Sequence, residues 1–174
     1  MRPTAALASA PGLCYTPRRH PSGAFLLDKF SITPALLQGT EPLLSLGLCE
    51  ARLQNDARWP WIVLVPRRAG AKEIEHLSKA DRVQLIEEEV AAGAAVRAMG
   101  SALGRAVEKL NIAALGNVTP QLHIHAVGRR SDDEAWPGPV WGVGVARPYD
   151  AQTLEIAKDA ALGVLSGWGL KTAS

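Results

Sequence analysis

An alternating stretch at residues 121–127, Gln-Leu-His-Ile-His-Ala-Val, constrains the fold of this chain more than any other part of the sequence. In an extended strand, successive side chains point to opposite faces of the sheet. Gln121, His123 and His125 would therefore share one face, and the apolar residues between them would share the other. The pattern predicts a strand that packs its apolar face on a core and presents two imidazoles and an amide on the opposite side.

Two histidines on one strand face fit three different roles. The simplest is a half-buried strand whose polar face is solvated and has no catalytic task. The second is a metal site, because His-x-His can present two nitrogens to one zinc ion. Zinc sites use three or four protein ligands, however, and the other candidate ligands show no paired spacing: His20, His76, Cys14 and Cys49.

The third role is nucleophilic catalysis on phosphorus. A neutral imidazole nitrogen can attack a phosphoryl group to form a transient phosphoramidate, and a second histidine on the same face can orient the phosphate or handle a proton. Amides close to the reaction centre can stabilise charge on the non-bridging oxygens. Asn117 and Gln121, on either side of residues 118–120, are candidates for that task.

The same residues resemble the histidine triad (HIT) family, whose pattern is His-φ-His-φ-His-φ-φ, with φ an apolar residue. The resemblance assigns His123 to the middle histidine, the nucleophile that takes the nucleotidyl group, and His125 to the third, which contacts the phosphate region. Gln121 stands in place of the first histidine, which supports the other two through hydrogen bonds. A glutamine amide can also donate and accept hydrogen bonds, so we expect Gln121 to contribute to substrate binding.

Two segments before the triad are also similar to the family. Residues 48–68 resemble its hairpin, in which a polar turn faces the ribose and the second strand ends in Val-Pro. The resemblance places Asn55 and Asp56 in that turn, as ribose contacts. It also places Asn111 and Asn117 where the family has amides ahead of the triad.

The region after the triad resembles a bacterial subgroup of the family. Arg129 follows the triad, as a basic residue often does, and residues 133–142 are rich in Trp, Pro and Gly. This run is similar to bacterial members that look like diadenosine polyphosphate hydrolases. The resemblance covers roughly residues 46–142, and it implies the HIT fold and a homodimer formed through the sheet and the long helix.

Length and composition fit one domain and a tail. The chain has 174 residues, of which 47% are hydrophobic, which is enough for a normal core. We expect a disordered tail at residues 1–23, where Pro and Arg occur without periodicity, and a single HIT-like domain at residues 24–174. No apolar run approaches the roughly 20 residues of a membrane helix, and a net charge of +2 argues against nucleic acid as a partner. Two cysteines without a disulfide pattern indicate a reducing compartment, the cytoplasm.

Hydrophobic periodicity predicts an α+β fold with an antiparallel sheet, one long helix and a C-terminal helix. Strands are expected at residues 43–54, 61–65, 111–115 and 121–127. Ser78 should cap the long helix at residues 79–99, and Asp150 should cap the last helix at residues 151–165.

Within the long helix, helical spacing predicts a buried stripe made of Val83, Ile86, Val90 and Ala94. The acidic run at residues 87–89 is expected on the solvated face of the helix. Gly100 is a predicted stop signal.

These observations favour a nucleotide phosphohydrolase or nucleotidyl transferase of HIT type, acting on a nucleoside phosphate or dinucleoside polyphosphate through a covalent nucleotidyl-histidine intermediate. His123 and His125 are the expected catalytic residues. The expected substrate-binding residues are Gln121, Asn117, Asn55, Asp56 and Asn111. We expect no metal site and no required cofactor, although a divalent cation could accompany the substrate. The alternative is a nucleotide-binding HIT-like module with little or no catalysis.

Overall fold

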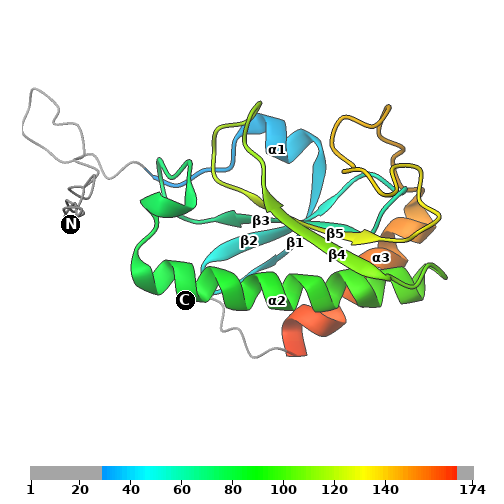
Figure 1. Ribbon diagram of the computed structural model, residues 1–174. Coiled ribbons are helices and arrows are strands. Elements are labelled where there is room, and N and C mark those ends of the chain that lie inside the picture. Colours follow the sequence, from blue (N-terminus) through cyan, green and yellow to red (C-terminus); the bar gives the residue numbers. More distant parts are fainter. Residues whose placement is uncertain (1–28, 168–174) are drawn as a thin grey trace, which may run out of the picture.

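Five strands form one antiparallel sheet in the part of the chain that the computed structural model describes, residues 29–167 (Figure 1). Their order across the sheet is β1-β2-β3-β5-β4. The strands are β1 (Thr40–Ser45), β2 (Cys49–Gln54), β3 (Trp61–Pro66), β4 (Lys109–Ala114) and β5 (Ile124–Arg129). The predicted tail at residues 1–23 lies outside the described residues.

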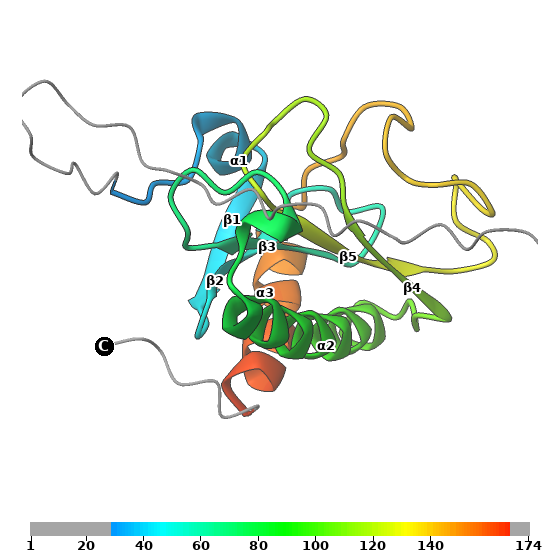
Figure 2. The same ribbon diagram turned by 60° about the vertical axis from the view of Figure 1, so that its left-hand side comes forward.

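Helices cover the two faces of the sheet unequally (Figures 1 and 2). They are α1 (Pro34–Gln38), α2 (Lys79–Ala102) and α3 (Ala151–Gly167), with a short 3-10 turn at Ile74–His76 before α2. α2 and α3 pack below the sheet in Figure 1, whereas α1, the β4–β5 connection and the loop after β5 stand above it. The predicted α+β fold, with its antiparallel sheet, long helix and C-terminal helix, is confirmed. No helix within residues 29–167 is long and apolar enough to cross a membrane.

The alternation predicted for the histidine strand is present, although β5 itself begins only at Ile124. Ile124 and Ala126 lie in the main core, whereas Val127 lies in a second apolar cluster on the opposite face of the sheet. Gly128 carries no side chain because a Cβ there would lie 2.6 Å from Val107 Cγ2 and 2.8 Å from Val96 Cγ1. β5 therefore rests closely on α2, and this contact supports the strand that follows His123.

Both predicted helix caps are present. Ser78 Oγ accepts a hydrogen bond from the backbone N–H of Asp81 at 3.0 Å, at the start of α2. Asp150 Oδ1 accepts one from the backbone N–H of Thr153 at 2.9 Å, at the start of α3. Each cap satisfies an N–H group that the first helical turn leaves without a partner.

The predicted strand at residues 43–54 is in fact two strands, β1 and β2, joined by a turn at residues 46–48. Glu88 of α2 reaches this turn and accepts hydrogen bonds from the backbone N–H groups of Leu48 at 2.6 Å and Cys49 at 2.8 Å. The turn is therefore stabilised by a helix that is distant in sequence. Hydrophobic periodicity carries no information about such a contact, which is why the two strands were predicted as one.

The predicted buried stripe of α2 is wrong. Val83, Ile86 and Val90 are 60%, 55% and 49% exposed. The face that packs on the sheet and on α3 is built largely from small residues such as Ala91, because small side chains let the helix approach its neighbours closely. Glu88, expected on the solvated face with the rest of the acidic run, lies on this buried face and is fully inaccessible to solvent.

Gly100 does not stop α2, which continues to Ala102. A Cβ at position 100 would lie 2.6 Å from the backbone oxygen of Arg105 and 2.7 Å from Val107 Cγ2. Glycine is therefore needed here because the chain returns closely past the helix. The positive φ of 67° at Gly104 marks the point where the chain leaves the helical path.

Candidate active site

His123 directly precedes β5 and His125 is the second residue of that strand, and both lie on the sheet face opposite to α2 and α3. The ring of His123 is held in one orientation, because its Nδ1 lies 2.7 Å from the backbone oxygen of Gln121. A carbonyl oxygen can only accept a hydrogen bond, so Nδ1 must carry the proton. Nε2 of the neutral ring therefore keeps its lone pair, and it is the nitrogen that can attack an electrophile.

His125 is held in the opposite tautomer by Trp61 of β3. The indole Nε1 of Trp61 lies 3.1 Å from Nδ1 of His125. An indole N–H can only donate a hydrogen bond, so Nδ1 of His125 must be the acceptor and its neutral ring must carry the proton on Nε2. His125 thus offers an N–H donor, where His123 offers a lone pair.

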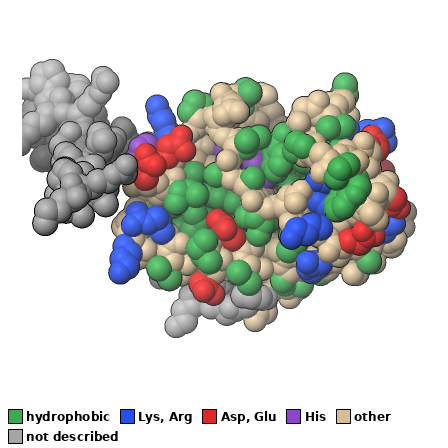
Figure 3. All heavy atoms as spheres, in the orientation of Figure 1, with side chains coloured by type: hydrophobic (Ala, Val, Ile, Leu, Met, Phe, Trp, Pro, Cys, Tyr) green, Lys and Arg blue, Asp and Glu red, His purple; other side chains and the backbone are tan. Residues whose placement is uncertain are grey.

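The two imidazoles lie side by side in a nearly dry environment. Their ring centroids are 4.8 Å apart and their planes are inclined by 81°. Only 5% of His123 and 7% of His125 is exposed. Figure 3 shows histidine atoms reaching the surface among hydrophobic side chains on this face of the molecule. The pair combines a ring nitrogen that keeps its lone pair with a hydrogen-bond donor, at a place where water is largely excluded and electrostatic interactions are strong.

Two tryptophans line the side of His125. The ring centroids of Trp61 and Trp141 lie 5.4 Å and 5.5 Å from that of the imidazole. Burial in this apolar environment, and secondarily the neighbouring His123, lowers the pKa of His125 from its ordinary 6.5 to about 4. His125 is therefore uncharged at neutral pH, as its hydrogen bond from Trp61 also requires.

This low pKa should make the stability of the fold depend on pH. In the unfolded chain His125 binds a proton below about pH 6.5, but in the folded chain it does so only near pH 4, so protons favour the unfolded state between these values. We expect the free energy of unfolding to fall by roughly 3 kcal/mol because of His125 as the pH is lowered from 7 to 4. Above pH 7 His125 should have no effect on stability. Urea unfolding of the wild type and His125→Asn at both pH values measures this difference. A variant that loses as much stability as the wild type would contradict the low pKa.

Gln121 lies close to the histidines, but its amide is bonded to another part of the protein. Oε1 accepts a hydrogen bond from the backbone N–H of Thr33, and Nε2 donates one to the backbone oxygen of Ser31, both at 2.8 Å. Asn117 is exposed in the β4–β5 connection. The structure thus brings Gln121 beside His123, whereas phosphate contacts by Gln121 and Asn117 stay predictions.

The predicted ribose contacts, Asn55 and Asp56, are both engaged within the protein. Asn55 Oδ1 accepts a hydrogen bond from the backbone N–H of Tyr149 at 3.0 Å. Asp56 is buried and pairs with Arg58 at 2.6 Å. Burial alone would raise the pKa of Asp56, but hydrogen bonds from Arg58 and from the backbone of Arg147 lower it. These contacts attach the segment before α3 to the β2–β3 turn, and a ribose role for either side chain stays a prediction.

Asn111 of β4 also has an internal partner. Its Oδ1 accepts a hydrogen bond from Nη1 of Arg129 at 2.7 Å. Arg129 is almost fully buried and donates two further hydrogen bonds to Asp133, at 2.7 and 3.0 Å. Although burial would raise the pKa of Asp133, hydrogen bonds from Arg129 and from backbone N–H groups lower it to about 2. Arg129 therefore anchors the loop that carries Trp141, and substrate binding by Asn111 stays a prediction.

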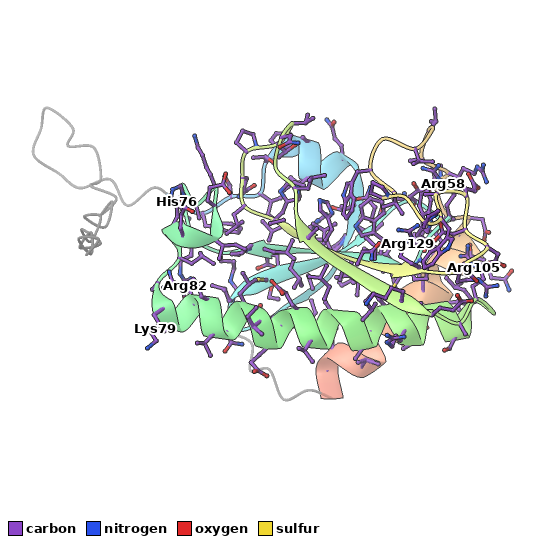
Figure 4. The ribbon with its side chains drawn as sticks, viewed as in Figure 1. Arg58, His76, Lys79, Arg82, Arg105 and Arg129 are labelled. Carbon is purple, nitrogen blue, oxygen red and sulfur yellow. The ribbon has the colours of Figure 1, made fainter. Side chains whose placement is uncertain are left out.

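A separate cavity of about 360 Å³ lies at the far end of β5. Its charged lining residues are Arg58, Arg105, Arg130, Arg147, Asp132, Asp133 and Glu134. Figure 4 shows Arg58, Arg105 and Arg129 gathered at this end of the sheet, with His76 at the opposite end. Neither imidazole lines the cavity, and the length of β5 places it roughly 15–20 Å from them. It is therefore a different site.

Within residues 29–167, no group of three or more His, Cys, Asp or Glu residues is arranged to hold a metal ion. His76 Nδ1 accepts hydrogen bonds from the backbone N–H groups of Lys72 and Glu73. The Cys49 thiol is buried, and this burial, with the nearby Glu88, raises its pKa far above the ordinary value. The His76 ring is therefore engaged in local hydrogen bonds with the backbone, and the Cys49 thiol is part of the buried core.

Trp61 is a site residue that the sequence analysis missed. It pairs with Val127, and Val63 pairs with His125, in the antiparallel register of β3 and β5. Trp61 therefore belongs to the same face of the sheet as the histidines. The sequence shows β3 as a nearly continuous apolar run, so the face on which Trp61 lies becomes known only with the pairing to β5.

Comparisons with known proteins agree with this architecture. A family model described as the HIT domain matches residues 40–132. A solved histidine triad protein from Sinorhizobium meliloti 1021 is 40% identical, with 78% of this chain and 97% of that chain covered and a TM-score of 0.71. Another from Bradyrhizobium japonicum is 37% identical, with coverages of 79% and 98% and a TM-score of 0.72. A third from Marinobacter aquaeolei VT8 is 35% identical, with coverages of 81% and 99% and a TM-score of 0.72. A search of curated proteins found no match.

Proposed function

Because this chain belongs to the HIT family, we propose that it is a nucleotide phosphohydrolase or nucleotidyl transferase that forms a covalent nucleotidyl intermediate on His123. The family supports nucleotide binding. The chemistry is supported by one observation above all, the opposite tautomers of the two neighbouring rings. The Gln121 carbonyl leaves a lone pair on His123 Nε2, and the Trp61 indole leaves a proton on His125 Nε2.

In the proposed mechanism, His123 Nε2 attacks the α-phosphorus of the nucleotide. A nitrogen–phosphorus bond forms as the bond to the leaving group breaks, and the leaving group departs with the electron pair. His125 Nε2–H donates a hydrogen bond to a non-bridging oxygen and stabilises its charge as the transition state forms. A water molecule then attacks the same phosphorus, the nitrogen–phosphorus bond breaks, and a proton is released with the nucleoside monophosphate. An alcohol or another phosphate in place of water would give transfer.

For the substrate, we propose a nucleoside phosphate, with dinucleoside polyphosphates as a specific class. The reason for the second choice is that residues 133–142 resemble a bacterial subgroup whose members look like diadenosine polyphosphate hydrolases. The proposal is tested by incubating the purified protein with diadenosine tetraphosphate and with adenosine 5′-phosphoramidate, and by measuring AMP by chromatography. Release of AMP from either compound supports it, and the ratio of the two rates identifies the preferred leaving group.

The proposed mechanism assigns no task to a protein-bound metal or to another cofactor. A divalent cation could still enter with a polyphosphate, bound to its oxygens. The proposed compartment is the reducing cytoplasm, since the buried Cys49 is a free thiol.

A nucleotide-binding module with little catalysis is the second candidate, and two observations favour it. The imidazoles are almost fully buried, and the amide of Gln121 is already bonded to Ser31 and Thr33. Such a module would raise its melting temperature with nucleotide but release no AMP.

We also propose that the protein is a homodimer that pairs through α2 and β4. β4 is an edge strand of the sheet, and Ile112 on it is exposed. Gly93 of α2 faces β4 so closely that a Cβ would lie 2.9 Å from Leu110. Ile86 and Val90 precede Gly93 on the same helix face, and Figure 3 shows hydrophobic side chains over α2. An exposed apolar face beside an unpaired strand edge is typical of a surface that a second copy covers.

Ile86→Lys should therefore weaken the dimer by at least about tenfold, because it places a charge in a surface that association would dehydrate. Sedimentation velocity over a range of protein concentrations measures the dissociation. Ile156→Lys is the control, since Ile156 is also an exposed isoleucine but lies on α3. A monomeric wild type, or equal dissociation of both variants, would contradict the proposed interface.

A further inference from the structure

A short segment lies on the histidine face of the sheet, and Gln121 holds it there. This strap consists of residues 29–38 and includes α1. The Gln121 amide uses its acceptor for the N–H of Thr33 and its donor for the carbonyl of Ser31, both at 2.8 Å, as a neighbouring strand would. Figures 1 and 2 agree that the β4–β5 connection, which leads to Gln121, stands beside α1.

The apolar side chains of the strap contact the catalytic neighbourhood directly. Phe30 and Ile32 pack against the apolar cluster that contains Trp61 and Val127. Trp61 is the residue that donates a hydrogen bond to His125. The strap therefore packs against the same apolar cluster that contains the side chain holding the tautomer of the second imidazole.

The backbone of Gln121 also holds the ring of His123. Its carbonyl accepts the hydrogen bond from His123 Nδ1 at 2.7 Å. The strap also brings a polar group of its own, because Thr33 Oγ1 is buried and has no hydrogen-bond partner within the described residues. Gln121 thus contacts His123 through its backbone carbonyl and the strap through its side-chain amide.

We propose that Gln121 is a positioning residue that clamps the strap beside His123 and His125, and that the clamped strap determines which substrates reach His123 Nε2. The second half of this inference rests on the proposed function. The clamp explains why an amide stands at this position, because it can pair with a backbone N–H and a backbone C=O at once. An imidazole offers one donor and one acceptor nitrogen only in its neutral form, and these two nitrogens point in directions that differ from those of an amide's N–H and C=O groups.

The test compares two variants with the same chemical change. Gln121→Met keeps the length of the side chain and removes both hydrogen bonds. Gln38→Met makes the same change at an exposed glutamine of α1 that has no role in the site. Amide hydrogen exchange of Thr33, measured by NMR without nucleotide, should accelerate roughly tenfold or more in Gln121→Met and stay unchanged in Gln38→Met.

Access to His123 is measured in the same samples with diethyl pyrocarbonate, which acylates neutral imidazole nitrogen. Peptide mass analysis should show His123 modified several-fold faster in Gln121→Met than in the wild type. Ile32→Ala weakens the apolar contact of the strap without changing Gln121. It should therefore also accelerate Thr33 exchange and His123 modification, which keeps the test valid even if Gln121→Met folds poorly. Unchanged Thr33 exchange in both variants would refute the clamp. Faster exchange with unchanged modification would refute the control of access.

Substrate choice is the last measurement. Release of the strap should raise the ratio of kcat/KM for a bulky aryl ester of AMP to that for adenosine 5′-phosphoramidate at least about threefold. An unchanged ratio in an active variant would refute the specificity role. The exchange and modification rates need no turnover, so an inactive protein would refute the proposed function and leave the clamp intact.

Discussion

His123→Ala should lower the turnover of a nucleotide substrate by at least about three orders of magnitude, which corresponds to roughly 4 kcal/mol of lost transition-state stabilisation. The reason is that His123 Nε2 is the proposed attacking atom, and alanine offers no substitute. The adjacent His125 cannot take over, because its proton is on Nε2 and its Nδ1 accepts the hydrogen bond from Trp61. Release of AMP under saturating substrate measures the effect.

His76→Ala is the matched control, because His76 is exposed and its Nδ1 accepts hydrogen bonds from the backbone N–H groups of Lys72 and Glu73. Its turnover should equal that of the wild type. Thermal unfolding of both variants separates a catalytic loss from a loss of fold, since a nucleophile variant should remain cooperatively folded at the assay temperature. Equal turnover by His123→Ala and the wild type would refute the mechanism.

Glu88→Ala should lower the free energy of unfolding by roughly 3–5 kcal/mol, a large part of the 5–15 kcal/mol that is usual for one domain. Glu88 is fully buried and accepts hydrogen bonds from the N–H groups of Leu48 and Cys49 and from the amide of Gln84. Alanine would leave both backbone donors buried without a partner. Urea unfolding at pH 7 measures the loss.

The neighbouring Glu87→Ala is the control for this effect. Glu87 is exposed on the same helix, so its substitution should change the free energy of unfolding by less than about 0.5 kcal/mol. A similarly small change for Glu88→Ala would mean that the β1–β2 turn does not depend on α2.

Strong local patterns in the sequence predicted much of the fold and the central histidine pair. The alternation at residues 121–127 placed His123 and His125 together on one face, and the Ser78 and Asp150 caps marked where α2 and α3 begin. These features depend on residues within a few positions of one another. Local periodicity and capping chemistry are sufficient to reveal them.

Contacts between distant segments account for what the sequence analysis did not predict. Helical spacing predicted that Val90 is buried. In the structure the alanine-rich face of α2 packs on the sheet instead, so Val90 is exposed and Glu88 is buried. Trp61 lies 64 positions before His125 and Gln121 lies 88 positions after Thr33. Contacts at these separations depend on the strand order and register, and the tautomers of the two histidines depend on these contacts in turn.

Detection of the covalent intermediate decides whether His123 is the nucleophile. The protein is mixed with a slowly hydrolysed nucleotide substrate, quenched without acid because a phosphoramidate is acid-labile, and examined by intact mass and peptide mapping. We expect one nucleotidyl group per chain, attached to His123 and missing from His123→Ala. AMP release without any adduct, or an adduct on another residue, would contradict it.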